Sequence, residues 1–474
     1  MSESENIATA AAPNGAGKAQ APIDEEDRLR PEFVSEVLDA VADGDDETAR
    51  RLVAPLHPAD IADLIELAAR DEREGLVKAL AGIVGPDVLA EMNDYVREGL
   101  LDDMEPQQVA DIAGQMETDD AVAILEDLDR DEQQAVLRAM EPDDRAAVEE
   151  ALSYPEESAG RLMQRDLCAV PEHWKVGQVI DYLRSTEELP DDFWEVFVVS
   201  PDHHPVGTCK LSIILRSPRE TRVSDIMVRE QTLIPVDMDQ EDVALRFQKY
   251  ALVSAAVVDG EGRLVGMITV DDVVHIIQEE AGEDVLLLSG AGEEGDINEP
   301  VIESYRSRVR WLITNLGTAL VATTIISFFE GAIAQLVILA ALMPIVAGVG
   351  GNAGTQTLAV TVRALATNQL TSSNRWRAVG REMRVALLNG GTVAAILGVG
   401  VALAFSSPLL GGVIGAAMLA NILVAGTVGS LVPLTLERFG VDPAVGSSIF
   451  VTMMTDSMGF LLFLGLAVAS GLVG

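Results

Sequence analysis

The sequence of 474 residues predicts a multi-domain membrane protein, with a superhelical domain of short α-helices, an α/β domain of two similar units, and a transmembrane domain of five helices. Three observations predict this fold class. A 12-residue repeat with helical spacing runs through residues 104–151. Short strand-like runs alternate with helical segments from about residue 160. Five apolar stretches, each about long enough to cross a bilayer, lie beyond residue 308.

Charged side chains are distributed unevenly between the first and the second part of the chain. The whole sequence has 76 acidic and 33 basic side chains, but only 6 of the acids and 9 of the bases lie beyond residue 300. The strongly negative first part repels nucleic acid and attracts cations, so we expect no nucleic-acid partner. Two interpretations of this acidity remain open, general solvation (including adaptation to high salt) and sensing of divalent cations.

The first 30 residues are acidic, small and polar, which predicts a disordered lead rather than a signal peptide. A helical N-domain is expected at 31–158. In its repeat, Met or Leu recurs every 12 residues, at Met104, Met116, Leu128 and Met140. Each unit opens with acids and a Pro, Thr or Asp, which favour the first turn of a helix. Most of these acids are therefore interpreted as helix-capping residues.

Residues 159–280 contain two units with the order strand, helix, strand, strand, helix. The second unit, with GRLVGMITVDDV at 262–273, resembles a CBS module closely, and the first resembles one more loosely. The resemblance to a tandem CBS pair implies binding of adenosine-type ligands or transmission of a regulatory state. A phosphate-binding Gly-rich loop and a Ser/His/Asp arrangement are both absent, and the five histidines have no ligand spacing, so an enzyme is not expected.

A Gly-rich, acidic connector with helical pieces is expected at 281–308, leading into a transmembrane domain at 309–474. Its five predicted spans are 309–329, 332–365, 384–405, 411–436 and 444–473. Arginines precede the first span and crowd the connection between the second and third, whereas the connections near residues 330 and 408 carry no base. The positive-inside rule therefore predicts a cell-membrane protein with cytoplasmic N-terminal domains and the C-terminus outside.

Few polar side chains interrupt the five spans. Asn352 and Gln356 lie in a glycine-rich part of the second span, and Asn421 lies in the fourth. Small residues of this kind permit close packing of helices, and irregular backbone at this depth is tolerated only inside protein or along a wet cavity. Helix packing and pore lining are both open interpretations for these residues.

Asp456 is the one acidic residue in the middle of a predicted span. A carboxylate at the centre of a bilayer costs about 2.5–3.5 kcal/mol on insertion scales, so it is expected to have a function. A cation site in a water-filled path is favoured over a hydrogen bond between helices by a protonated Asp. The predicted spans hold no Lys, Arg or His near it, which argues against a proton relay.

The order of domains, together with PIVAGVGGNAGTQ at 344–356 and VDPAVGSSIFVTMMTDSMG at 441–459, resembles the MgtE family of magnesium channels. The resemblance covers the chain from about residue 31. It implies a homodimer with a pore on its two-fold axis. Asp456 would be the ion-binding residue of this pore, the backbone around Thr452 would help to form the site, and the partners would be Mg²⁺ and the lipid bilayer.

The resemblance also implies closure of the channel by cytoplasmic Mg²⁺ bound between acidic residues of the soluble domains, the connector and the membrane edge. Ala251 and His275 stand where the family can have acids, so the full set of bound ions is not assumed. ATP at the CBS pair is a further possibility that the family raises. The matching acidic positions are Asp239, Glu241, Asp272, Glu283, Asp284 and Asp442, with a weaker match at Asp119.

The sequence thus predicts a Mg²⁺-selective channel that mediates magnesium uptake and is closed by intracellular Mg²⁺. One alternative is a secondary transporter that couples Mg²⁺ or Co²⁺ to a gradient. Another is a non-transporting sensor whose membrane half is only an anchor. An enzyme is the least favoured class, because nothing in the sequence resembles a nucleophile paired with a base.

Overall fold

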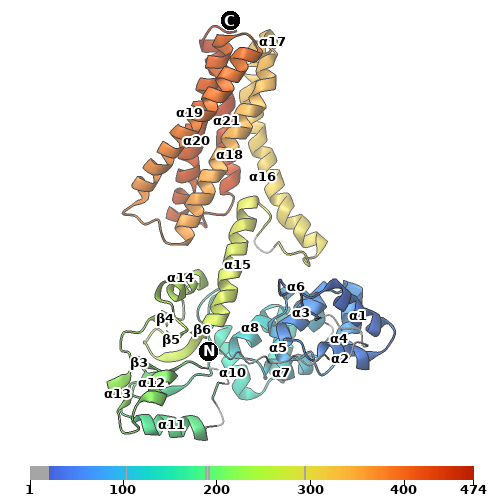
Figure 1. Cartoon of the computed structure of the whole chain (residues 1–474), viewed down its shortest axis with the longest axis vertical. Coiled ribbons are helices and arrows are strands. Elements are labelled where there is room, and N and C mark those ends of the chain that lie inside the picture. Colours follow the sequence, from blue (N-terminus) through green and yellow to red (C-terminus); the bar gives the residue numbers. More distant parts are fainter. Residues whose placement is uncertain (1–20, 103, 187–188, 191–192, 293–294, 474) are drawn as a thin grey trace, which may run out of the picture. The chain divides into compact units, whose positions relative to one another are not determined.

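The computed structural model describes residues 21–102, 104–186, 189–190, 193–292 and 295–473 (Figure 1). The predicted disordered lead lies outside the described residues from 1 to 20. The chain divides into two compact units. The first, residues 1–238 with 255–268, contains the helical domain and two β-sheets. The second, residues 239–254 with 269–474, contains two helices of the α/β region and all the membrane-length helices. Each unit is described by itself below.

Ten short helices form the N-terminal domain of the first unit. The last four begin at residues 106, 118, 130 and 142, which is the 12-residue period of the sequence. Pro58, Pro86, Pro106 and Pro142 each stand in the first turn of a helix, where a missing N–H costs no hydrogen bond. The ten helices are α1 (Pro31–Ala42), α2 (Asp46–Val53), α3 (Pro58–Leu67), α4 (Arg70–Ala79), α5 (Pro86–Ala90), α6 (Asp94–Leu101), α7 (Pro106–Ala113), α8 (Thr118–Glu126), α9 (Arg130–Ala139) and α10 (Pro142–Ala151).

A single apolar core runs through this domain, so the predicted stack of helices is confirmed. The one buried arginine, Arg97 at 5% exposure, donates to the Met92 carbonyl and to Asp94 and Asp127 at 2.6 and 2.7 Å. Residues 21–30, predicted as part of the lead, differ from the expectation. Leu29 is buried and Ile23 packs against the same core, because these two apolar side chains gain contact with it.

Two three-stranded sheets with the same strand order form the α/β region. In each, the first strand pairs in parallel with the second, and the third lies on the other side of the second. This repetition confirms the two predicted units. The first α/β unit consists of β1 (Ala169–Pro171), α11 (Val176–Ser185), β2 (Glu195–Val199), β3 (Pro205–Lys210) and α12 (Leu211–Arg216). After α13 (Val223–Ile226), the second α/β unit consists of β4 (Leu233–Pro235), α14 (Gln240–Tyr250), β5 (Ser254–Val258), β6 (Leu264–Thr269) and α15 (Val270–Ser289).

The connector differs from the predicted range of 281–308. Helix α15 crosses the expected boundary at 280 and ends where Gly290 adopts a left-handed conformation with φ +73°. The next helix, α16 (Val301–Ser327), starts at Pro300 and runs straight into the first span. The connection is therefore two helices with a break between them, because Gly and Pro end one helix and begin the other.

Five helices of the second unit are long and apolar enough to cross a membrane, as predicted. Most of them extend beyond the apolar runs, because a helix can continue with polar and basic residues into the headgroup region. A short helix, α17 (Glu330–Gln335), precedes the second of them. The break between α17 and α18, at Leu336 and Val337, lies inside the apolar stretch predicted at 332–365, and no polar residue marks it. The remaining membrane-length helices are α18 (Ile338–Ala366), α19 (Arg375–Ala404), α20 (Pro408–Arg438) and α21 (Ser447–Ala469).

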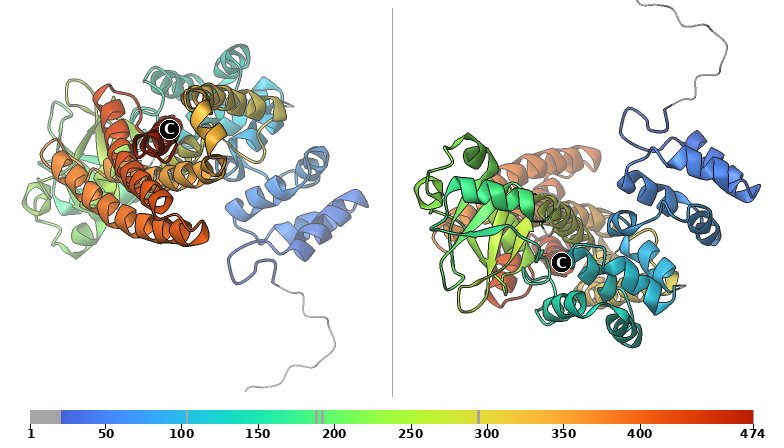
Figure 2. Two further views of the ribbon diagram at one scale, coloured as in Figure 1. Left: turned by 90° about the horizontal axis from the view of Figure 1, so that it is seen from above. Right: turned by 90° about the horizontal axis from the view of Figure 1, so that it is seen from below.

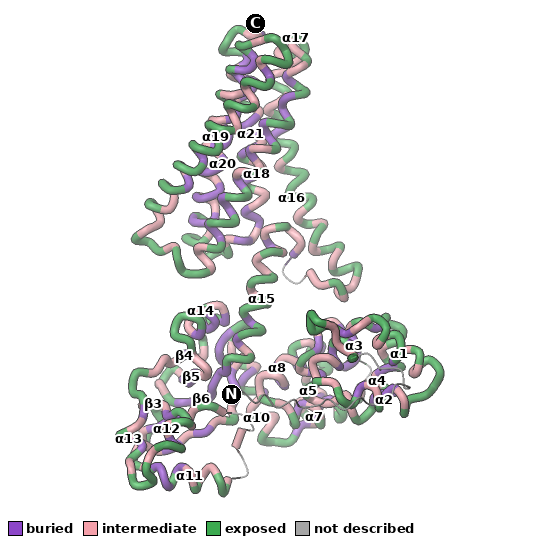
Figure 3. Tube along the Cα trace, viewed as in Figure 1, coloured by how far each residue is buried: buried purple, intermediate pink, exposed green. Residues whose placement is uncertain are grey.

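Helix α20 is the centre of this bundle and has the most buried residues of the five (Figure 3). It packs against α18, α19 and α21, and the view from above shows α19 and α20 side by side (Figure 2). Glycines permit this contact, since a Cβ on Gly398 would stand 2.8 Å from the Gly411 carbonyl oxygen. Most of α16, by contrast, remains exposed in the single chain, with only Ala322 buried.

Candidate functional site

Asp456 lies near the middle of α21 and is half-buried within the single chain. In the described part of the chain, its carboxylate has no hydrogen bond and no ion pair. The neighbouring Thr455 is fully buried, and its hydroxyl donates to the Thr452 carbonyl at 3.0 Å. For the alternative, a protonated Asp456 that bonds to another helix, the described residues therefore offer no partner.

Thr452 stands one helical turn before Asp456, so the two share a face of α21. Both are partly exposed, whereas Val451 and Thr455 are buried. The buried side of α21 packs on glycines of α18, because a Cβ on Gly354 would stand 3.4 Å from a methyl carbon of Thr455 and closer still to Val451. The helix therefore presents its Thr452 and Asp456 face away from that contact.

The three amide residues predicted in the spans are placed in two different ways. Asn352 and Gln356 lie four residues apart on α18, share a face, and are exposed in the single chain. Asn421 is fully buried in α20 and donates its amide to the Val346 carbonyl at 3.0 Å. In this conformation Asn421 contacts the neighbouring helix rather than any open surface.

Five of the predicted metal-binding acids lie around α14 and α15 in the second unit. Asp239 caps α14 by accepting from the Glu241 backbone N–H at 3.0 Å. Asp272, in the first turn of α15, accepts from the Thr269 hydroxyl at 2.7 Å. Glu283 and Asp284 are half-buried in the same helix, about three turns further on.

Glu241 has an unusual electrostatic environment. Burial, and then the carboxylates of Glu280, Asp284, Asp239 and Asp242, raise the pKa of Glu241 to about 7. Burial and the carboxylate of Asp442 also raise the pKa of Asp284. Crowding of like charges is the second cause in both cases. A hard dication such as Mg²⁺ prefers carboxylate oxygens and would relieve this repulsion, so these residues fit such an ion chemically.

Asp442 lies in the turn before α21 and accepts from the Ala444 backbone N–H at 2.7 Å. Its carboxylate also lies close enough to Asp284 of α15 to raise the pKa of that residue. Sequence reasoning missed Glu280, which lies four residues before Asp284 and accepts from the Gln240 amide at 2.7 Å. Its spacing from Asp284 on one helix face was the signal that could have identified it.

A complete metal site is not assembled by these groups in the single chain. Among the described residues, no three His, Cys, Asp or Glu side chains come close enough together to hold one metal ion. Asp119, in the first turn of α8, belongs to the other compact unit. Among the described acids, Glu241 lies near Glu280 and Asp284, and Asp284 lies near Asp442, without three carboxylates meeting at one point.

Comparison with known proteins gives three matching family models. Residues 343–466 match a model described as a divalent cation transporter, MgtE. Residues 56–157 match the MgtE intracellular N domain, and residues 223–279 match a CBS domain. The three matches follow the order of the helical domain, the second α/β unit and the membrane helices.

Curated relatives extend this similarity over most of the chain. A protein of Thermus thermophilus named magnesium transporter MgtE is 35% identical over 66% of this chain and 70% of its own length. The protein of the same name from Enterococcus faecalis is 32% identical over 66% of this chain and 69% of its own. Among solved structures, the cytosolic domain of the Mg²⁺ channel MgtE in complex with ATP is 28% identical, with a TM-score of 0.48 over 51% of this chain and 99% of that one.

Proposed function

This chain belongs to the MgtE family of magnesium transporters, and from that premise we propose that it is a Mg²⁺-selective channel for magnesium uptake, closed by Mg²⁺ on the side of its soluble domains. The observation that carries the proposal is Asp456. It is a carboxylate in the middle of a membrane-length helix, half-exposed, with no partner among the described residues of the same chain. Such a group is costly in a bilayer unless it faces water and a cation.

We propose that the protein functions as a homodimer whose pore lies between the two copies. Two Asp456 carboxylates would then face one dication, each from its own chain. Mg²⁺ gives up its water slowly, so two carboxylates can hold a largely hydrated ion through the oxygens of its water shell. The exposed face of α21 with Thr452 supports this arrangement, since it is left uncovered in the single chain.

Asn352 and Gln356 are proposed to line the same path, because they are polar side chains exposed on a membrane-length helix. Their amide oxygens can accept hydrogen bonds from the water around a hydrated ion. Asn421 contributes differently in this proposal. It is buried against Gly350 and Gly459, and it fixes the position of α18 through the bond to Val346 rather than meeting the ion.

Regulation is proposed to depend on the acidic groups of α14, α15 and the turn before α21. Mg²⁺ would neutralise the repulsion around Glu241 and between Asp284 and Asp442 when it binds there. Without the ion, these carboxylates repel one another and separate. Asp239, Asp272 and Glu283 are retained as proposed ligands of the same regulatory ions, whereas Asp119 of the helical domain and ATP at the CBS pair stay predictions.

The orientation in the membrane is proposed from the distribution of arginine. The start of α16 and the connection between α18 and α19 are rich in Arg, which favours the cytoplasmic side for both and for the soluble domains. After five spans the C-terminus would lie outside the cell membrane.

Growth of a bacterium that lacks its own magnesium transporters tests whether the chain transports at all. Expression of the full chain is expected to restore growth in medium with low Mg²⁺. Failure to restore growth, with the protein present in the membrane at the level of a working transporter, would favour the alternative of a sensor with a membrane anchor.

Protection against proteolysis tests whether Mg²⁺ acts on the acidic half. Millimolar Mg²⁺ is expected to slow cleavage of the soluble domains of the purified full chain by several-fold, and a chelator is expected to restore it. NaCl of equal ionic strength is the control, because it screens charge without binding carboxylates specifically. Equal protection by NaCl would indicate general screening and would contradict the regulatory sites.

A further inference from the structure

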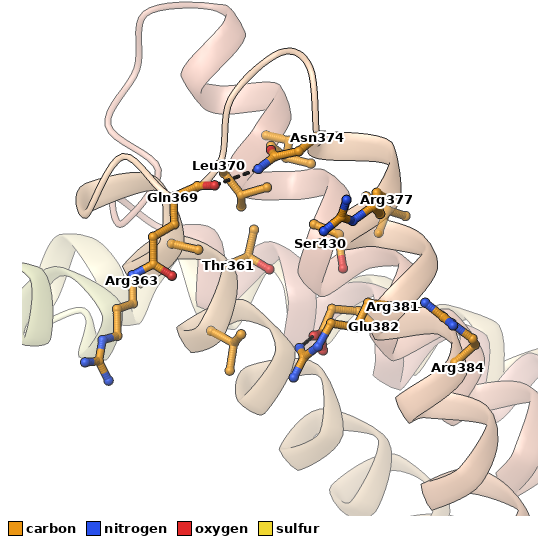
Figure 4. Close-up of a pocket in the computed structure, with 15 residues that line it drawn as sticks. Thr361, Arg363, Gln369, Leu370, Asn374, Arg377, Arg381, Glu382, Arg384 and Ser430 are labelled. Carbon is orange, nitrogen blue, oxygen red and sulfur yellow. Dashed lines mark hydrogen bonds and ion pairs between the residues drawn. The ribbon is translucent and has the colours of Figure 1, made fainter.

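A cavity of about 660 Å³ opens at the end of the membrane bundle where α18 ends and α19 begins (Figure 4). Its walls come from the last turns of α18, the connection at 367–374, the first turns of α19 and the last turns of α20. All of these belong to the second compact unit. The cavity is separate from Asp456 and from the acidic groups of α14 and α15, none of which line it.

The cavity is strongly basic. Arg363, Arg377, Arg381 and Arg384 line it, and Glu382 is its one acidic residue. Glu382 is buried at 8% exposure and pairs with the Arg381 guanidinium. Arg363, Arg377 and Arg384 form no ion pair with any described residue. These three residues therefore add uncompensated positive charge to the lining of the cavity.

Hydrogen bonds of the Asn374 side chain hold one wall of the cavity in place. The Asn374 amide donates to the Gln369 carbonyl at 2.8 Å and accepts from the Thr371 backbone N–H at 2.8 Å, which holds the connection in place. Asn374 is also the N-cap of α19, a helix of 30 residues. The positive end of this helix dipole points at the same place as the arginines, and together they favour a bound anion.

The surroundings of the cavity indicate a membrane lipid as the source of that anion. Beside the arginines, Trp376 is 73% exposed, and Trp is enriched where a protein meets the membrane–water interface. Further along α19, Leu387 and Leu388 are exposed at 53% and 72%. An apolar surface thus continues from the basic cavity along the helix, where acyl chains can lie.

We propose that this cavity binds the phosphate of an anionic membrane phospholipid, with the headgroup among Arg363, Arg377 and Arg384 and the acyl chains along α19. Guanidinium groups bind phosphate oxygens with two parallel hydrogen bonds. A zwitterionic headgroup has the same phosphodiester but also a cation that the arginines repel, so a headgroup with a net negative charge is favoured. Basic pockets between membrane helices bind such headgroups in general. A free phosphate ion is the competing source, and the test below separates the two.

Native mass spectrometry of the purified full chain tests the proposal, with phosphatidylglycerol and phosphatidylcholine added in equal amounts. The wild type is expected to retain phosphatidylglycerol preferentially. The triple variant Arg363→Gln, Arg377→Gln, Arg384→Gln is expected to bind it roughly 100-fold more weakly, from about fivefold for each basic residue near an anionic lipid. The matched control is Arg306→Gln, Arg308→Gln, Arg310→Gln, which removes the same charge from the start of α16.

An unchanged affinity in the cavity variant, or an equal loss in both triple variants, would overturn the proposal. Displacement of phosphatidylglycerol by millimolar inorganic phosphate would show that the site takes the free ion, which would overturn the lipid source. Should the triple variant fail to fold, as judged by its helical circular dichroism, Arg377→Gln alone decides. A loss of about fivefold supports the proposal and no loss overturns it.

Discussion

Asp456→Ala is expected to reduce magnesium uptake to background while the protein becomes no less stable. In a homodimer the substitution removes both carboxylates from the proposed pore, so the hydrated ion loses its only charged contacts there. Removing a carboxylate without a partner from the membrane also relieves an insertion cost of about 2.5–3.5 kcal/mol per chain. Growth rescue at low Mg²⁺ and thermal unfolding of the purified protein measure the two effects.

The combination of these two results distinguishes a pore residue from a structural one. A structural hydrogen bond by Asp456 would give a variant with both lower stability and lower transport. Glu330→Gln is the matched control, because it removes an acid from the exposed start of α17 in the same membrane half. If the Asp456→Ala variant takes up Mg²⁺ as fast as the Glu330→Gln control, the proposal that Asp456 lines the pore is contradicted.

Neutralisation of Glu283, Asp284 and Asp442 together is expected to leave the channel open at Mg²⁺ concentrations that close the wild type. The variant removes the carboxylates that would hold the regulatory ion between α15 and the turn before α21, so Mg²⁺ can no longer tie these two segments together. Coupling between two sites of a protein usually changes affinity by about 5–150-fold, and a shift in this range is expected for the Mg²⁺ concentration that halves uptake. Uptake into proteoliposomes at increasing Mg²⁺ on the side of the soluble domains measures the shift.

A control with the same change in charge makes this result specific. Asp131→Asn, Glu132→Gln and Asp143→Asn remove three exposed acids from the helical domain. An equal shift in both triple variants would mean that total charge, rather than the acids of α15 and the following turn, governs closure. An unshifted inhibition curve in the first variant would contradict the regulatory proposal outright.

Much of the fold was predictable because its signals are local. The 12-residue period and the prolines place the start of four helices, since Pro in the first turn leaves no hydrogen bond unmade. Apolar length predicts the five membrane helices. The break at Leu336 was not predictable, because it lies inside an apolar run and depends on packing of α17 against α18. The packing of residues 21–30 was likewise not predictable, because it depends on contact with core residues that come later in the sequence.

The candidate sites were predictable to different degrees. Asp456 stands out through the cost of its charge, which needs no knowledge of the fold. The importance of Glu280 depends on the approach of α14 to α15, which the sequence does not reveal. The basic cavity depends on packing of Arg363 and Arg377 beside Ser430, residues far apart along the chain. The proposed pore between two copies could not be predicted from local signals either, because it depends on how the exposed surfaces of two chains pack together.

The two interpretations of the acidic half can now be weighed on particular residues. Asp71, Asp131 and Asp143 are exposed in first turns of helices, where they complement the helix dipole. Solvation and capping account for such acids. Glu241 and Asp284 are half-buried beside other carboxylates, which solvation does not explain. We infer that both interpretations apply, to different parts of the same chain.

Current through the purified wild-type protein in a voltage-clamped bilayer tests the central claim most directly. With equal Na⁺ and pH on both sides, a channel is expected to carry a Mg²⁺ current that reverses at the equilibrium potential of Mg²⁺ and falls when Mg²⁺ is raised on the side of the soluble domains. A flux that requires a gradient of Na⁺ or H⁺, or no current in a protein that rescues growth, would contradict the channel and favour a coupled transporter.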